Sequence, residues 1–268
     1  MNELQKSPQA IDAYLHSEPV KARLEQALLS PKKAATFTSS LLSLARQSSL
    51  LRNCDSGQVV SAALIATSMG LSLSPQLGQA YIVPFRNNKT GSFEPQFQIG
   101  YKGLIQLCVN SGLFSTIICR PVYDGEIVDY DPFHDIFRFN TAQRKSDKVI
   151  GYYAYFSLIN GFYKADFWTV ADVQKHATRY SSSYRQKSYS PWTTNFDEMA
   201  CKTVLKSILN RYAPKSVEME RAIRFDQGVV SPPSQDFSDI DSYSVEYADN
   251  THTPPISQIS QSNEHPQQ

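Results

Sequence analysis

The pattern of hydrophobic and polar residues is clearest between Gln79 and Gly112. Two stretches of strand-forming residues, 80–85 and 93–100, flank a polar cluster at 87–91 that has the Asn and Gly residues of a hairpin turn. The apolar residues that follow recur at helical spacing and stop at Gly112, which suits the end of a helix. We therefore predict a strand, a turn, a second strand, and a helix that leaves the second strand directly.

One side of this predicted helix is polar. Because successive helical residues are about 100° apart, Lys102, Gln106 and Asn110 form a stripe beside the apolar side. Gly103 leaves the backbone uncovered nearby. A stripe of this kind is usually the solvated side of an amphipathic helix, so a functional role needs support from elsewhere in the chain.

Helical spacing and turn residues predict the remaining elements. Helices are expected over 11–29 with an interruption near Pro19, 34–51, 57–69, 170–180 and 192–212. Turns at 124–125 and 160–161 predict further hairpins, which would complete a small antiparallel sheet built from residues 80 to 168. We predict an α+β protein with an N-terminal helical subdomain, a small central antiparallel sheet with hairpins, and C-terminal helices lining a basic groove.

The last predicted helix repeats the polar stripe of the first. Apolar residues cover most of its circumference and leave a narrow strip that contains Asn195, Lys202, Lys206 and Asn210. If the apolar sides are packed, this strip faces a groove or solvent, and Lys202 and Lys206 present two charges about one turn apart. The alternative is a solvated edge whose lysines only keep the helix soluble.

Basic and aromatic residues are interleaved between 170 and 224, where ten Lys and Arg residues face five Asp and Glu residues. Tyrosines and Trp192 alternate with these charges in the loop over 181–191 and beside it. This mixture binds a nucleic-acid strand by phosphate attraction and base stacking, although a flexible loop with tyrosines for packing would look similar. The candidate contacts from this region are Lys175, Arg185, Lys187 and Trp192.

The net charge of +1 conceals an uneven distribution. Residues 231–268 carry six acidic residues and no Lys or Arg, so a tail of charge −6 is joined to a body of charge +7. The sequence thus predicts a body that binds a polyanion and a disordered acidic tail that competes for the same surface or recruits a partner. A body charge of this size is also common in proteins that bind no nucleic acid.

The sequence lacks the motifs by which many classes of enzyme are recognised. The sequence contains no phosphate-binding loop of the P-loop type. Its one dense acidic cluster, which could bind a divalent ion in a nuclease, comprises Asp124, Glu126, Asp129, Asp131, Asp135 and His134. Aspartate is also favoured in turns for its backbone geometry alone, and no nearby lysine completes a nuclease pattern. We expect no catalytic residues and no bound metal.

The compartment is predicted from what the sequence lacks. No apolar run approaches the roughly 20 residues of a membrane span, and the N-terminus has no signal-peptide pattern. The four cysteines are far apart and indicate neither disulfides nor a zinc site. A cytoplasmic protein without a membrane partner is expected.

Three long motifs, in this order and at matching separations, resemble the RecT family of phage and prophage single-strand annealing proteins. They are GLSLSPQLGQAYIVPF, FQIGYKGLIQLCVNSG and WTTNFDEMACKTVLKSILNRYAPKSVEMERAI. The resemblance spans roughly residues 41–224. It divides the chain into an N-terminal segment for protomer contacts (1–40), a core that binds and anneals DNA (41–230) and the acidic tail (231–268).

The resemblance implies an ATP-independent, non-hydrolytic recombinase that binds single-stranded DNA, pairs it with a complementary strand and assembles into rings or helical filaments. It implies no required cofactor and leaves open whether Mg²⁺ assists pairing. A companion 5′-to-3′ exonuclease is the expected partner, and a host single-stranded DNA-binding protein is a further candidate. A metal-dependent nuclease and a passive strand-coating protein are the alternatives.

The resemblance also assigns residues to the DNA-binding site. The Gly-Tyr-Lys-Gly element gives Tyr101, Lys102 and Gly103, and the last helix gives Lys202, Lys206 and Arg211 as phosphate contacts. Gln106 and Asn210 are added as candidates because they lie on the same two polar stripes. Cys201 stands where many relatives have a second basic residue. Weaker candidates on the predicted hairpin are Arg86, Lys89, Gln96 and Gln98.

Overall fold

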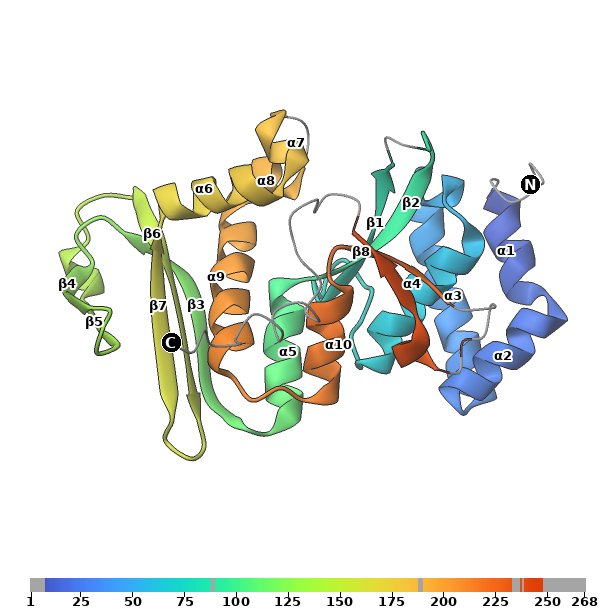
Figure 1. Ribbon diagram of the computed structural model, residues 1–268, viewed down its shortest axis with the longest axis horizontal. Helices are drawn as coiled ribbons and strands as arrows, with labels where there is room; N and C mark the ends of the chain where they lie inside the picture. The colour runs from blue at the N-terminus through green and yellow to red at the C-terminus, as the bar shows by residue number, and fades with distance from the viewer. Residues whose placement is uncertain (1–7, 88–89, 188–189, 233–236, 238, 248–268) are drawn as a thin grey trace, which may run out of the picture.

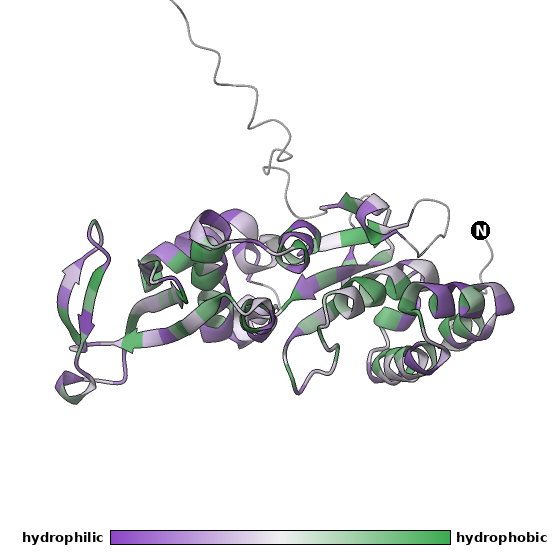
Figure 2. Cartoon of the chain, turned by 90° about the horizontal axis from the view of Figure 1, so that it is seen from below, coloured by the Kyte–Doolittle hydropathy of each residue, from purple (hydrophilic) through white to green (hydrophobic). Residues whose placement is uncertain are grey.

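The computed structural model describes residues 8–87, 90–187, 190–232, 237 and 239–247. Its α-helices are α1 (Pro8–His16), α2 (Glu18–Leu28), α3 (Pro31–Gln47), α4 (Ser56–Ser68), α5 (Tyr101–Ser111), α6 (Val170–Tyr180), α7 (Ser182–Arg185), α8 (Pro191–Thr194), α9 (Phe196–Tyr212) and α10 (Val217–Phe225). Its strands are β1 (Ala80–Arg86), β2 (Phe93–Ile99), β3 (Phe114–Tyr123), β4 (Ile127–Asp131), β5 (Ile136–Phe139), β6 (Val149–Leu158), β7 (Tyr163–Thr169), β8 (Gly228–Ser231) and β9 (Ser244–Glu246). Short 3₁₀-helices are η2 (Leu51–Asn53), η3 (Thr141–Gln143) and η4 (Ile240–Ser242). Figure 1 and Figure 2 show these elements in one elongated row, with α1 and α2 at one end and the β4–β5 hairpin at the other.

The first four helices form the predicted N-terminal helical subdomain. The predicted interruption near Pro19 is confirmed, since α2 begins with that proline in its first turn. Asp55 caps α4 by accepting a hydrogen bond from the backbone N–H of Gln58 at 2.9 Å. Residues 59–66 of α4, all apolar except Ser61, are buried, and the helix packs against β2 and β8.

The hairpin at the centre of the sequence forms where the pattern predicts it. β1 and β2 pair antiparallel from Ala80 opposite Ile99 to Arg86 opposite Phe93. The helix α5 follows β2 and ends before Gly112, which adopts φ +67° in the left-handed region. This strand, turn, strand and helix prediction is therefore confirmed.

The prediction of one sheet spanning residues 80–168 is wrong, because the strands are divided among separate sheets. β1 and β2 join the C-terminal strands in the order β1-β2-β8-β9, whereas β3, β6 and β7 form a second sheet in the order β3-β6-β7. β4 and β5 pair only with each other. The helix α5 stands between β2 and β3, and β8 takes the edge of β2 that a continuous sheet would have used.

The helix α9 joins the two halves of the molecule. It packs against β3, β6 and β7 on one side and against α5 on another (Figure 1). The sequence predicts one helix over 192–212, but the chain breaks at Asn195, whose φ and ψ of −135° and 54° are not helical. The turn α8 therefore precedes α9 and is separate from it. The capped helix predicted over 170–180 is confirmed, since Thr169 and Asp172 form a capping box at the start of α6.

The C-terminal segment is folded beyond residue 230, where the charge pattern predicts the start of a disordered tail. Phe237 and Tyr243 are each only 1% exposed, and β9 pairs with β8. Arg221 donates two hydrogen bonds to the carboxylate of Asp241, at 2.8 and 2.6 Å. Residues 231, 232, 237 and 239–247 thus belong to the folded body, and residues 233–236, 238 and 248–268 of the predicted tail lie outside the described residues.

Across the described part of the chain, none of the helices combines the length and apolarity that a membrane crossing would need.

Candidate nucleic-acid interface

A cleft separates the β1–β2 hairpin and the start of α5 from the helices α6, α8 and α9. It consists of two adjoining cavities of about 440 and 500 Å³. Residues that line both cavities are Val83, Gln98, Pro191, Met199 and Lys202. Because the cavities share these walls, they form one continuous cleft. Lys102 lines the first cavity and Lys206 lines the second.

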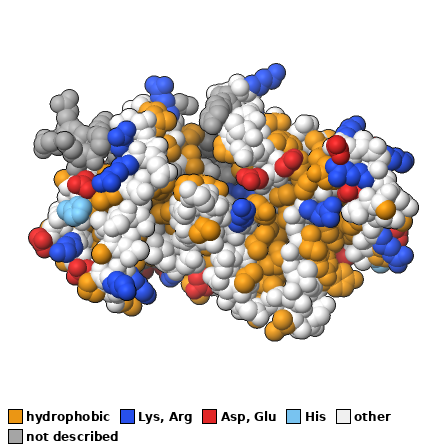
Figure 3. All heavy atoms as spheres, turned by 180° about the vertical axis from the view of Figure 1, so that it is seen from behind, with side chains coloured by type: hydrophobic (Ala, Val, Ile, Leu, Met, Phe, Trp, Pro, Cys, Tyr) orange, Lys and Arg blue, Asp and Glu red, His pale blue; other side chains and the backbone are white. Residues whose placement is uncertain are grey.

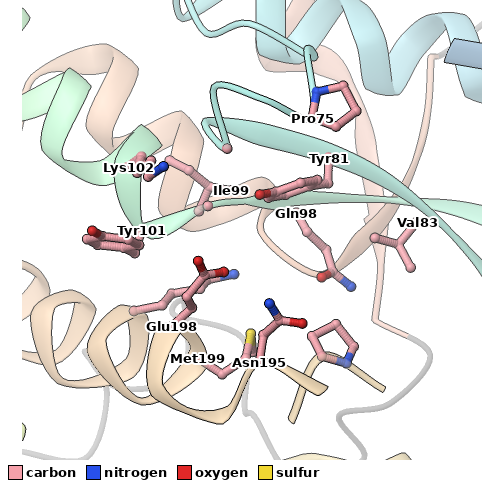
Figure 4. Close-up of a pocket in the computed structure, with 14 residues that line it drawn as sticks. Pro75, Tyr81, Val83, Gln98, Ile99, Tyr101, Lys102, Asn195, Glu198 and Met199 are labelled. Carbon is pink, nitrogen blue, oxygen red and sulfur yellow. The ribbon is translucent and has the colours of Figure 1, made fainter. Parts of the chain in front are cut away.

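The mouth of the first cavity brings together three elements. In Figure 4, Tyr101 and Lys102 at the start of α5 lie on one side, and Glu198 and Met199 from α9 lie across from them. The side chain of Gln98 projects from β2 toward the part of the cavity where Asn195 lies (Figure 4). Lys102 is exposed to solvent, so its ammonium is available to a ligand in the cleft.

Glycines allow α5 to begin this close to the cleft. A Cβ atom on Gly103 would lie 2.1 Å from the carbonyl oxygen of Gln79, and one on Gly100 would lie 2.1 Å from the carbonyl oxygen of Gly78. Gly103 is buried, so the expectation that it leaves the backbone uncovered is wrong. Because Gly103 has no side chain, α5 can pack against the backbone just before β1, and this packing positions the neighbouring Lys102 at the cleft.

The polar stripe on α5 divides between two roles. Lys102 faces the cleft, whereas Gln106 accepts a hydrogen bond from the Gln79 side chain at 3.4 Å and donates one to Asn110 at 2.7 Å. Gln106 and Asn110 line neither cavity. The stripe is thus partly a binding surface and partly a brace between α5 and the preceding loop.

The two lysines predicted on α9 share one buried carboxylate. Asp226, which follows α10, accepts hydrogen bonds from the Lys202 ammonium at 3.0 Å and from the Lys206 ammonium at 2.5 Å. It also accepts the backbone N–H of Ile99 on β2 at 3.0 Å. The side chains of Asp226, Lys202 and Lys206 are 0%, 7% and 29% exposed. We call these three residues the charged triad.

Both lysines line the cleft, so the predicted strip faces a groove, but the prediction that the two charges are presented alike is wrong. Lys202 is buried, and only Lys206 retains substantial exposure. The physical reason is that the turn between α10 and β8 covers the Lys202 side of α9 and supplies a carboxylate there. A buried ammonium needs such a partner, because its desolvation in the absence of one is costly.

Burial and charge act in opposite directions on the triad. Burial lowers the pKa of the Lys202 ammonium, and the Asp226 carboxylate opposes that shift only in part. Burial by itself would raise the pKa of the Asp226 carboxyl, but Lys202 and Lys206 together hold that pKa below its ordinary value. Asp226 is therefore ionised at neutral pH and offsets part of the lysine charge at the floor of the cleft.

One wall of the second cavity is aromatic. The ring of His176 lies 5.6 Å from that of Trp168 and 4.6 Å from that of Tyr180, and all three residues line the cavity. Burial lowers the pKa of His176, and the charges of Lys206 and Arg179 lower it further. His176 is thus neutral at pH 7 in the unliganded cleft.

Trp192 does not present its ring as a stacking platform, as the loop composition suggests. It is only 7% exposed and packs against Tyr184 and Phe196, with ring centroids at 6.0 and 5.7 Å. Trp192 contributes a wall of the second cavity and anchors the turn α8 to α9.

The other predicted cations lie outside the cleft. Arg86, Lys175, Lys187 and Arg211 are exposed but line neither cavity. Arg185 donates hydrogen bonds to the carbonyl oxygens of Thr178 and Arg179, so it holds the end of α6. Lys89 lies outside the described residues. Figure 3 shows the face of the molecule opposite to that in Figure 1. Lys and Arg side chains are scattered over it among acidic ones, so no single basic patch dominates this face.

The carboxylates of the predicted acidic cluster do not converge. Asp135 pairs with Lys164 at 2.7 Å, Asp131 with His134 at 2.6 Å, and Glu126 with Arg120 at 3.7 Å. Within the described ranges, no three His, Cys, Asp or Glu side chains are grouped so that they could hold a metal ion. The cluster serves the β4–β5 hairpin and its attachment to the second sheet.

A sequence model of the RecT family matches residues 35–241, which include every element that builds the cleft. The chain belongs to the RecT family. It is 39% identical over 220 residues to the Bacillus subtilis protein "Uncharacterized protein YqaK", covering 82% of this chain and 73% of that protein. It is 28% identical over 218 residues to "Protein RecT" of Escherichia coli, covering 80% of this chain and 79% of that protein.

Family membership confirms the resemblance seen in the three motifs. The RecT family consists of single-strand annealing proteins, so this chain is a DNA recombination protein of that class. The match extends beyond residues 41–224 on both sides and includes part of the folded segment after β8.

Sequence reasoning missed Asp226 and His176 as parts of the cleft. Asp226 lies between the apolar residues Phe225 and Val229, where an isolated acid is unexpected, and this placement was the one available signal. His176 carried no comparable signal, since it is one of several isolated histidines.

Proposed function

We propose that this protein binds single-stranded DNA in the cleft, pairs it with a complementary strand without nucleotide hydrolysis, and does so as a ring or filament of protomers. The observation that carries the proposal is the continuity of the cleft from Lys102 to Lys206, which lie on segments far apart in the sequence. Membership in the RecT family supports the same function.

The cleft suits a nucleic-acid backbone because its charged side chains come from several elements along its length. Lysines 102, 202 and 206 line it, against Glu198 and Asp226. Phosphate contacts of this kind hold a strand regardless of its sequence. The base edges then stay available, and base pairing with a second strand supplies both the specificity and the free energy.

Self-association follows from the size of the cleft, since a site on one protomer spans few nucleotides and neighbouring protomers must continue it. The N-terminal helices are the proposed contact. Leu29 at the end of α2 is 90% exposed, and Leu50, between α3 and α4, is 45% exposed. We propose that a neighbouring protomer covers them.

The remaining partners follow from the proposed reaction. A 5′-to-3′ exonuclease would supply the single strand, and a host single-stranded DNA-binding protein would compete for it. We propose that pairing requires no nucleotide and no resident metal, and a magnesium titration of the pairing rate tests whether Mg²⁺ assists by screening the two strands.

An annealing assay with two complementary labelled oligonucleotides and no ATP tests the proposal. Lys102→Met and Lys206→Met should each slow pairing and weaken strand binding, whereas Lys215→Met, an exposed lysine outside the cleft, should not. Wild-type pairing rates in both folded cleft variants would refute the assignment of the cleft. A passive coating protein would bind one strand but slow pairing, and a nuclease would shorten the DNA when magnesium is added.

A further inference from the structure

Gln96 is a buried amide with an unused hydrogen-bond donor in the wall of the cleft. It is 3% exposed, and its side-chain nitrogen Nε2 has no hydrogen-bond partner. Its side-chain oxygen Oε1 accepts a hydrogen bond from the amide nitrogen of Gln98 at 3.5 Å. In this orientation of the Gln96 amide, the oxygen has a partner and the nitrogen has none. An unpaired buried donor is costly, and native proteins retain few of them.

Gln96 lines the same cavity as the charged triad, with its amide nitrogen buried in the cavity wall. Gln96 lies on β2 opposite Val229 of β8, three residues beyond Asp226 along the chain. Asp226 already accepts from Lys202, Lys206 and the Ile99 N–H. The carboxylate is thus committed to three donors, and the amide of Gln96 is left without an acceptor.

Two side chains beside the charged carboxylate therefore offer donors to this cavity, namely Lys206 and Gln96. Lys206 is partly exposed and has further ammonium hydrogens beyond the one given to Asp226. Gln96 offers the two hydrogens of its unpaired amide nitrogen. A group with several acceptor oxygens and a negative charge matches this set, and a phosphate group has both.

We propose that Gln96 and Lys206 form a phosphate subsite at the floor of the cleft, that the buried Lys202 adds positive charge beneath it, and that Asp226 is the positioning residue that holds the two ammonium groups in place. The inference rests on the proposed function, because it assigns the phosphate to the backbone of the bound single strand. Free inorganic phosphate has the same chemistry as a phosphate of the DNA backbone. An experiment in which phosphate replaces chloride in the buffer distinguishes these two ligands.

The substitution Gln96→Met tests the subsite, because Met has a similar shape and no donor. Affinity for one fixed oligonucleotide should fall on the order of tenfold, as expected when a hydrogen bond to a charged group is lost. The salt dependence of binding should stay unchanged, because Gln96 carries no charge. By contrast, Lys206→Met should make the slope of log K against log salt shallower by about 0.7.

The melting temperature of Gln96→Met distinguishes a binding role from a structural one. Removing an unsatisfied buried donor should leave the melting temperature unchanged or raise it. Weaker DNA binding without loss of stability therefore supports the subsite. If the oligonucleotide affinity and the melting temperature both fall, Gln96 has a structural role and the phosphate subsite is overturned. Gln174→Met, on the exposed side of α6, is the matched control and should change neither quantity.

The remaining outcomes separate this inference from the proposed function. If Gln96→Met binds the oligonucleotide like the wild type, the subsite is wrong while DNA binding stands. If the wild type binds no oligonucleotide, the proposed function itself fails. In a second arm, inorganic phosphate replaces chloride at constant ionic strength. If phosphate raises the melting temperature of the wild type but not of Gln96→Met, and oligonucleotide affinity is equal for both, the site holds a free anion and the nucleic-acid assignment is overturned.

Discussion

Lys202 and Asp226 form a buried ion pair across the floor of the cleft, with 3.0 Å between ammonium nitrogen and carboxylate oxygen. The two residues come from α9 and from the turn between α10 and β8. The same carboxylate holds Lys206 and the backbone of β2, so one side chain links three segments around the cleft. Stability and the proposed DNA binding are therefore coupled at this point.

Replacing Asp226 alone should destabilise the fold. Asp226→Asn leaves the Lys202 ammonium buried without a counter-charge, and breaking a buried pair in this way costs about 3 to 5 kcal/mol. The double variant Lys202→Met with Asp226→Asn removes both charges and should recover most of the lost stability, because replacing a whole buried pair with neutral groups is often close to neutral. Urea unfolding of the three proteins measures the difference.

The double variant also tests the phosphate subsite. It removes the charge of Lys202 and the carboxylate that positions Lys206, so single-stranded DNA affinity at low salt should fall even though stability is recovered. If the double variant is as unstable as Asp226→Asn, the unpaired charge of Lys202 is not the cause of the stability lost in Asp226→Asn.

Deletions at the C-terminus should locate the boundary between body and tail. Removing residues 231–268 takes away Phe237 and Tyr243, and fully burying one large apolar side chain stabilises a fold by about 1.5 to 3 kcal/mol. Removing only residues 248–268 leaves both of these buried side chains in place. The first deletion should lower the melting temperature strongly, and the second should leave it near the wild-type value. Equal melting temperatures for the two would contradict the packing of Phe237 and Tyr243.

Trp192 should matter for stability rather than for base stacking. Trp192→Ala removes a buried ring that packs between Tyr184 and Phe196, and large-to-small changes of this kind cost about 3 to 5 kcal/mol. Trp192→Phe should cost less, because the ring contacts are partly kept. Chemical denaturation measures both effects. The opposite result, an unchanged stability with weaker DNA binding, would restore Trp192 as a stacking platform.

His176 should make stability fall as the pH decreases. Its pKa in the folded state is lowered by burial, with Lys206 and Arg179 adding to the effect. In the unfolded chain it titrates near its ordinary value of about 6.5, so below that pH the unfolded state binds a proton that the folded state does not. Stability is lost as the pH falls through about 6.5 toward the folded pKa, and His176→Gln should reduce this loss. Melting temperatures of both proteins from about pH 7.5 to about pH 5.5, a range that brackets the unfolded pKa, test it. An identical decline in the variant would exclude His176 as the cause.

Local sequence patterns determined most of the secondary structure. Short-range chemistry determines the structures of Asn87 and Gly91 in the first hairpin turn, of the Asn-Gly step at 160–161 and of the capping pair Thr169 and Asp172, because each acts within a few residues. The break at Asn195 could not be predicted from the hydrophobic pattern, because the apolar spacing continues through it. The division into separate sheets could not be predicted either, since the pairing of β2 with β8 joins residues more than a hundred positions apart.

The sequence by itself determined the family, the polar stripes and the candidate lysines at 102, 202 and 206. Only the tertiary structure decided which of them a ligand can reach. Spacing along a helix specifies which side chains share a face, but it does not specify what packs against that face. Here Asp226 arrives from a later segment, buries Lys202 and leaves Lys206 at the edge of the cleft, because a charge removed from water is stable only beside an opposite one.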